Sequence, residues 1–194
     1  PNDRESFYQE IEEQIKAMRK DGAEFIIVYP HWGIEYQMTE ASWQREIAQK
    51  LCDMGVDAII GGHPHVIEPV DVFTSEDGTH KTFCAFSLGN QLSNQRREMM
   101  RLKTGNTEDG LFIDLEITRN KKGDVSLTGV KYIPTWVYKN ASGPTYSIVP
   151  VDDPSTVEEK TGIKGIQAQA QASYDRTYKI IGDGANKVSE AYGF

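Results

Sequence analysis

The sequence has few cysteines, no long hydrophobic run and fewer basic than acidic residues. Its 194 residues include only two cysteines, Cys52 and Cys84. Two are too few for a disulfide framework, so we expect both to be small core residues. No apolar stretch approaches the roughly 20 residues that a membrane-spanning helix needs, and no signal peptide opens the sequence. We therefore expect no segment of this sequence to cross a bilayer.

The charge balance argues against one class of partner. Acidic residues outnumber basic ones 29 to 21, which gives a net charge of −8. A field of that sign repels phosphate backbones, so we expect no binding of bulk nucleic acid through a basic face. The length fits one ordinary domain, or one domain with an appendage. Because the sequence begins at Pro1, we interpret it as a processed product or a piece of a longer protein.

The first third of the sequence alternates predicted helices with predicted buried strands. Helices are predicted over residues 4–20 and 42–54, and strands over residues 24–29 and 58–60. The helices carry apolar side chains three and four residues apart. The strands are continuous apolar runs, which is typical of strands buried on both faces of a parallel sheet. This order predicts an α/β layer with right-handed crossovers.

The rest of the sequence is antiparallel in style. Strands are predicted over residues 66–73, 81–87, 110–118 and 125–133, the first two forming a hairpin around residues 76–78. Residues 93–108 are polar and predict a surface loop. From about residue 155 the alanines and glutamines predict helices that cover one flank. We therefore expect one domain over residues 1–150 and a helical tail over residues 151–194 that packs on it.

Three of the four histidines follow the predicted buried strands. His31 follows the first strand, and His63 and His65 follow the second in a loop with Gly61 and Gly62. Ligands of such sheets bind beyond the carboxyl ends of the strands, and imidazole is a common ligand of divalent metals. A metal site and a set of structural histidines are both open on this pattern. We expect His80, in the predicted hairpin turn, to be solvated.

Three ordered motifs resemble the CapA family of bacterial capsule and poly-γ-glutamate synthesis proteins. They are His31-Trp32-Gly33-Ile34-Glu35-Tyr36, Gly61-Gly62-His63-Pro64-His65-Val66-Ile67-Glu68-Pro69 and Ser87-Leu88-Gly89-Asn90. The resemblance covers roughly residues 11–150. That family is similar in fold to the calcineurin-like metallophosphoesterases, four-layer α/β/β/α sandwiches with two metal ions between their sheets. The resemblance thus implies an α/β fold of which this chain is the C-terminal half.

The resemblance implies roles for single residues. His31 and His63 would share one divalent ion and His65 would reach toward a second, with His63 also taking part in catalysis. Manganese, zinc, iron and nickel all accept imidazole, so the metal stays open. Glu35 and Asn90 are either partners that orient an imidazole or structural residues. Trp32 is either a wall of the pocket or a packed core residue.

One departure from the family is as informative as the match. No Gly-Asp motif or asparagine-rich motif of the family precedes His31, so the carboxylate that would bridge two cations is missing. We expect this chain alone to bind metal weakly and turn over little. Three explanations stay open for the missing N-terminal half: it lies on another chain, it was lost by proteolysis, or it was absent from the start. A further possibility is that a second copy of the chain completes the sheet.

Two functions stay open at this point. One is capsule or poly-γ-glutamate biosynthesis with a metallophosphatase-like, metal-dependent hydrolase site acting on a phosphoester or on an amide of the polymer. The other is a non-catalytic module that binds the anionic polymer or assembles a synthesis or export complex. The resemblance implies an extracytoplasmic protein, anchored at the cell surface by a segment that this sequence does not contain.

Overall fold

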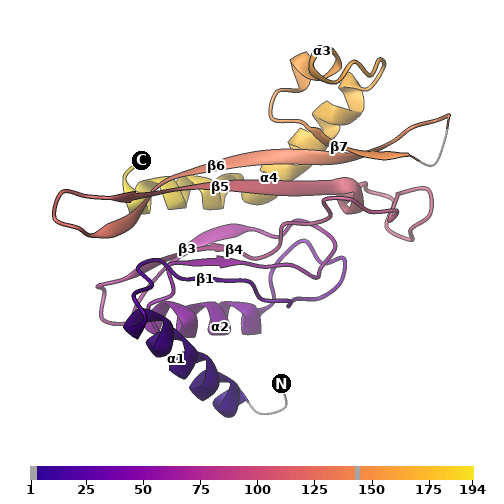
Figure 1. Cartoon of the computed structure of the whole chain (residues 1–194). Coiled ribbons are helices and arrows are strands. Elements are labelled where there is room, and N and C mark those ends of the chain that lie inside the picture. The colour runs from indigo at the N-terminus through magenta and orange to yellow at the C-terminus, as the bar shows by residue number, and fades with distance from the viewer. Residues whose placement is uncertain (1–3, 143–144) are drawn as a thin grey trace.

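The computed structural model describes residues 4–142 and 145–194 as two sheets with flanking helices (Figure 1). The first half contains α1 (Arg4–Lys20), β1 (Ile27–Val28), α2 (Ser42–Asp53), β2 (Ala58–Ile60), β3 (Val70–Thr74) and β4 (Lys81–Ala85). The second half contains η1 (Asn106–Glu108), β5 (Asp109–Arg119), β6 (Val125–Lys139), β7 (Tyr146–Pro150), η2 (Pro154–Thr156), α3 (Val157–Thr161) and α4 (Gln167–Tyr192). The chain is thus a mixed α/β fold, which confirms the predicted fold class.

The two sheets differ in strand direction. The first has the order β1-β2-β4-β3, with β1, β2 and β4 parallel and β3 antiparallel to β4. The β3–β4 pair is the predicted hairpin. The second sheet, β5-β6-β7, is antiparallel throughout. Because β1 and β2 run the same way, the loops that follow them leave at the same edge of the first sheet, and these loops carry the predicted histidines.

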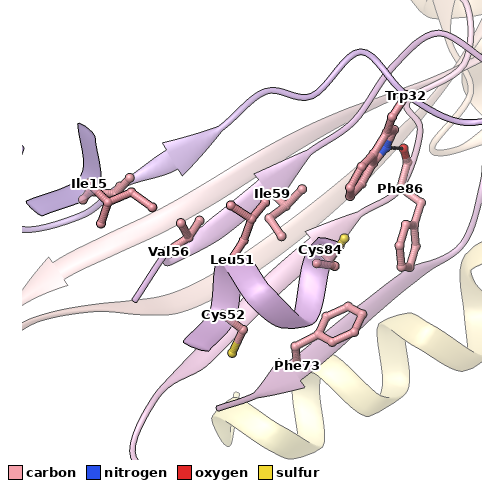
Figure 2. Close-up of a cluster of buried hydrophobic side chains, with 11 residues drawn as sticks. Ile15, Trp32, Leu51, Cys52, Val56, Ile59, Phe73, Cys84 and Phe86 are labelled. Carbon is pink, nitrogen blue, oxygen red and sulfur yellow. Dashed lines mark hydrogen bonds between the residues drawn. The ribbon is translucent and has the colours of Figure 1, made fainter. Parts of the chain in front are cut away.

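The helices α1 and α2 cover one face of the first sheet (Figure 1). Their shared core contains Ile15 of α1, Leu51 and Cys52 of α2, Ile59 of β2 and Cys84 of β4 (Figure 2). Both cysteines are free and buried, which confirms the prediction that they are core residues. This core gives the first sheet a fixed base from which its loops emerge.

The opposite face of the first sheet meets the second sheet. Phe83 of β4 and Leu111 of β5 are buried in this inter-sheet core together with Ile181 of α4. The helix α4 packs against both β3 and β6 and closes one flank. It lies so close to β3 that a Cβ on Gly184 would be 1.7 Å from the Val70 carbonyl oxygen. None of the helices in the described part of the chain combines the length and apolar character of a membrane span.

Some predicted elements differ from the observed ones. Residues 24–29 were predicted as a strand buried on both faces, but only Ile27–Val28 forms a ladder and Tyr29 is 72% exposed. The reason is that β1 lies at the edge of the sheet and pairs with β2 alone. The strand β6 continues six residues beyond the predicted end and pairs with β7, which was not predicted.

Candidate histidine site

The loops that follow β1 and β2 are held together by backbone hydrogen bonds. His31 forms a bridge with Gly62, the Trp32 amide donates to the Gly62 carbonyl at 2.9 Å, and the Gly62 amide donates to the Pro30 carbonyl at 3.1 Å. The parallel pairing of β1 with β2 therefore continues past the ends of the strands. It brings the two predicted histidine motifs side by side.

The three predicted histidines lie together at this edge. The ring centroids of His31 and His63 are 4.5 Å apart, and those of His63 and His65 are 6.3 Å apart. His63 has φ 115° and His65 has φ 60°, a region that residues with a Cβ adopt at a cost of about 1–3 kcal/mol. Such strain is typical of functional loops. We call His31, His63 and His65 the histidine cluster.

Trp32 fixes the loop of His31 from below. Its side chain is buried, and its Nε1 donates a 2.8 Å hydrogen bond to the Phe86 carbonyl (Figure 2). The rings of Trp32 and Phe86 also stack at 5.9 Å. Trp32 and His31 both line a cavity of about 520 Å³ between α1 and α2. Trp32 is therefore a packed residue that also contributes to a pocket wall.

Asn90 holds His65 in one orientation. Its Nδ2 donates to the carbonyl oxygens of His65 and Thr107 at 3.1 and 2.9 Å, and to Gln95 Oε1 at 3.1 Å. The amide oxygen consequently faces Nδ1 of His65 at 3.0 Å. Because an amide oxygen only accepts, Nδ1 of the neutral imidazole carries the proton and Nε2 keeps its lone pair. His65 can therefore bind a cation through Nε2.

The Asn90 contact predicts a change in the tautomer of His65. In Asn90→Ala no side-chain acceptor faces Nδ1, so we expect the neutral His65 ring to populate both tautomers. Nitrogen-15 NMR of the imidazoles measures this directly. His80 is an internal control, because its Nε2 faces the Val56 carbonyl at 2.8 Å and should stay an Nε2–H tautomer. A His65 ring that keeps a single Nδ1–H tautomer in the variant would contradict the role of Asn90.

Tyr36 and Gln95 are parts of this site that the sequence reasoning missed. The Tyr36 ring stacks on His65 at 6.0 Å, and Gln95 Nε2 donates to the Tyr36 hydroxyl at 3.3 Å. Tyr36 has φ 66°. This backbone conformation is unusual for a tyrosine, so the residue type gives no reason to predict it. Glu35, in contrast, is exposed, and the described residues give it no hydrogen bond or ion pair with the histidine cluster. Its role stays a prediction.

Glu68 is a buried carboxyl group beneath the His31 loop. It is 1% exposed, and its Oε2 accepts a 2.9 Å hydrogen bond from Gln44. Its Oε1 has no hydrogen-bond partner among the described residues, and a Cβ on Gly33 would lie 3.4 Å from it. Burial raises the pKa of Glu68 to about 7. The hydrogen bond from Gln44 lowers this pKa, but its effect is smaller than that of burial.

The raised pKa predicts that Glu68→Gln stabilises the fold at high pH. An unfolded glutamate ionises near pH 4.5, whereas folded Glu68 stays protonated up to about pH 7. Wild-type stability is thus lost as the pH rises between these values, by about 1.4 kcal/mol per unit. Glutamine avoids ionisation but leaves two N–H groups unpaired, one more donor than the protonated carboxyl group has, so we expect a net gain of about 1–2 kcal/mol at pH 8 and none at pH 4. Urea unfolding across this range measures it, and a pH-independent difference would contradict it.

The residues match only part of the metal centre that the resemblance implies. Two imidazoles 4.5 Å apart can face one cation, since metal–nitrogen bonds are about 2.0–2.1 Å for zinc. Within residues 4–142 and 145–194, however, no group of three or more His, Cys, Asp or Glu side chains is arranged to hold a metal ion. The cluster fits one side of a metal centre, and the described residues do not fit a complete dinuclear one.

Comparison with known proteins identifies relatives of this part of the chain. Residues 2–95 match the family described as bacterial capsule synthesis protein PGA_cap. Over 111 residues the chain is 31% identical to the PGA biosynthesis protein CapA of Bacillus subtilis (strain 168), covering 57% of this chain and 26% of that protein. Over 80 residues it is 34% identical to the capsule biosynthesis protein CapA of Bacillus anthracis, covering 41% and 18%.

The chain therefore matches only about a quarter or less of the length of these relatives. The matched residues 2–95 include the whole histidine cluster and Asn90. Through this segment, just under half of its length, the chain is similar to the PGA_cap family of bacterial capsule synthesis proteins.

Proposed function

We propose that the histidine cluster supplies the imidazole ligands of a divalent metal site in a metallophosphatase-like hydrolase of capsule biosynthesis. The observation that carries this proposal is the convergence of three imidazoles from two strand-end loops, with His31 and His63 at 4.5 Å. The carboxylate ligands would have to come from residues outside the cluster, on the same protein or on a second copy. The relatives' names place them in capsule and PGA biosynthesis, and the proposed location of this chain is accordingly the cell envelope, outside the cytoplasm.

The residues of this chain have distinct tasks in the proposed site. Asn90 directs the Nε2 lone pair of His65 outward by accepting from Nδ1. Trp32 fixes the backbone that carries His31, through its bond to the Phe86 carbonyl. The positive φ of His63 turns its side chain away from the direction that a regular strand would give it. A site held by such supporting contacts keeps its ligands in place before a metal binds, which favours affinity.

Zinc titration of the purified chain, followed by calorimetry, tests the proposal. We expect weak binding of at most one ion per chain, because neutral imidazoles alone do not offset the charge of two cations. The variant His63→Ala should lose this binding. His80→Ala is the matched control, because His80 lies in the β3–β4 hairpin and its side chain bonds to the Val56 carbonyl. The His80→Ala variant should bind zinc as the wild type does.

Two outcomes would contradict this account. Equal zinc binding by wild type and His63→Ala would show that the cluster is not the ligand set. Tight binding of two ions per chain would show that the carboxylates are present after all.

A non-catalytic polymer-binding module is the second candidate. The observation that favours it is the lack of a carboxylate among the described residues arranged with the histidines as a metal site. Activity on a generic phosphodiester, with zinc or manganese added and a candidate partner segment from the same protein supplied, separates the two. Turnover that His63→Ala abolishes supports the hydrolase, whereas polymer binding without metal or turnover supports the module.

A further inference from the structure

The hydroxyl group of Tyr36 lies beside the histidine cluster and has no task yet in the proposed site. The Tyr36 ring stacks on the imidazole of His65, with the two ring centroids 6.0 Å apart and 23° between the ring planes. Both side chains are half-buried, so a small ligand can reach them. The phenol ring therefore covers one face of the imidazole whose Nδ1 is held by Asn90 and whose Nε2 keeps its lone pair.

The backbone of Tyr36 has a conformation that favours glycine. Its φ is 66°, in the left-handed region that residues with a Cβ adopt only at a cost. In this conformation the Tyr36 amide donates a 2.7 Å hydrogen bond to the carbonyl oxygen of Pro64, the residue between His63 and His65. Glycine would form the same backbone bond without strain, but it has no side chain. The strained tyrosine therefore indicates that the side chain has a role at this site.

The directions of the hydrogen bonds around Tyr36 can be worked out from the backbone. The side-chain amide of Asn90 contacts two carbonyl oxygens, those of His65 and Thr107, at 3.1 and 2.9 Å. Because a carbonyl oxygen only accepts, the Asn90 atom that faces both must be the nitrogen Nδ2. The same nitrogen faces the Gln95 side chain at 3.1 Å. The Gln95 atom at this contact is therefore the amide oxygen Oε1.

The direction of the next bond follows from this assignment. With its oxygen at Asn90, Gln95 presents Nε2 to the Tyr36 hydroxyl, at 3.3 Å. An amide nitrogen only donates, so the Tyr36 oxygen is the acceptor of this bond. The hydroxyl proton must then point elsewhere, and no residue in the described part of the chain accepts it. Tyr36 thus carries a hydrogen-bond donor without a protein partner beside the histidine cluster.

We infer that the Tyr36 hydroxyl donates a hydrogen bond to an anionic oxygen of the substrate held at the histidine cluster. This inference rests on the proposed function, since a substrate beside Nε2 of His65 lies next to the ring that carries the hydroxyl. A hydrogen bond to a charged oxygen is stronger than one between neutral groups. The hydroxyl therefore favours a ligand with an ionised oxygen, and Gln95 keeps it turned for that task by occupying its acceptor side.

The test uses dimethyl phosphate as the probe, with the whole chain at saturating zinc. Dimethyl phosphate is a monoanion with two unesterified oxygens, and phosphorus-31 NMR follows its binding. The variant Tyr36→Phe keeps the ring that stacks on His65 and removes only the hydroxyl. We expect it to bind dimethyl phosphate about fivefold more weakly than the wild type, the size expected for one hydrogen bond to a charged oxygen at a half-buried site. Its zinc affinity and the Nδ1–H tautomer of His65 should stay unchanged.

Tyr29→Phe is the matched control for the loss of a hydroxyl. Tyr29 lies two residues before His31 and is 72% exposed, and no described residue forms a hydrogen bond with its hydroxyl. We expect this variant to bind dimethyl phosphate within twofold of the wild type. Thermal unfolding of both variants checks that each is folded.

Four outcomes would overturn the inference. They are equal dimethyl phosphate binding by wild type and Tyr36→Phe, no binding by the zinc-loaded wild type, equal weakening by Tyr29→Phe, and loss of zinc affinity in Tyr36→Phe. The last would mean that the hydroxyl holds the histidines rather than the ligand. Zinc titration before the anion is added separates this inference from the proposed function. If the wild type binds no zinc, both fail, whereas normal zinc binding with no effect of Tyr36→Phe removes the Tyr36 role alone.

Discussion

Replacing Gly61 with alanine should cost about 3 kcal/mol or more of the free energy of unfolding. A Cβ at this position would lie 2.0 Å from the Phe86 carbonyl oxygen and 2.4 Å from Trp32 Nε1. The oxygen and the indole nitrogen form the hydrogen bond that fixes the loop of His31. The added methyl group therefore forces the ends of β2 and β4 apart or breaks that bond, and overpacking against backbone is among the costlier single substitutions.

Gly62→Ala is the matched control for this prediction. No atom lies within 4 Å of a Cβ at Gly62, and its φ is not positive, so we expect a change within about 1 kcal/mol. Chemical denaturation followed by circular dichroism measures both variants. If the two alanines have the same effect, the close approach of Gly61 to Phe86 does not stabilise this edge of the sheet.

Replacing Glu108 with glutamine should cost about 3 kcal/mol at pH 7, with a pH dependence opposite to that of Glu68→Gln. Burial opposes ionisation of Glu108, but hydrogen bonds from the Arg97 side chain and backbone and from Trp136 outweigh it and lower its pKa to about 2. An unfolded glutamate has a pKa near 4.5. The stabilisation is complete above that value and is lost as the pH falls toward 2, at about 1.4 kcal/mol per unit.

Unfolding measured from pH 3 to pH 7 tests this prediction. The difference between wild type and Glu108→Gln should shrink steadily below pH 4.5. Glu98→Gln is a useful control, because Glu98 is half exposed and its contact with Arg96 should contribute less than 1 kcal/mol. A constant difference over the whole range would mean that the charge of Glu108 is not what stabilises the fold.

The pattern of apolar residues along the sequence predicted two elements with their correct ends. The helix over residues 4–20 was predicted with its observed ends, and the strand over residues 58–60 likewise. The helix carries its apolar residues three and four apart, and the strand is a short continuous apolar run. The strand over residues 24–29 was overestimated because an apolar run does not reveal whether a second neighbour strand exists. The strand β7 was missed because its five residues become a strand only by pairing with β6.

The same distinction applies to the candidate site. The histidines were predicted as site residues because they follow predicted buried strands. Ligands of such sheets bind beyond the carboxyl ends of the strands, so the order of elements alone indicates this position. The role of Asn90 as the partner of His65 depends on its contacts with Gln95 and Thr107. The spacing of these residues along the sequence does not predict that they meet. Residues 93–108 were predicted as a surface loop, yet Glu108 and Thr107 are buried. The reason is that Arg97 neutralises Glu108, a pairing that no local pattern shows.

The central claim is that His31, His63 and His65 form one ligand cluster, and imidazole nitrogen-15 NMR during zinc titration tests it most directly. Before zinc is added, neutral His65 should show an Nδ1–H ring and His80 an Nε2–H ring, as their hydrogen bonds require. On titration the signals of His31, His63 and the Nε2 of His65 should shift together, while those of His80 stay fixed. Shifts at His80 alone, or at one cluster histidine without the others, would contradict the claim.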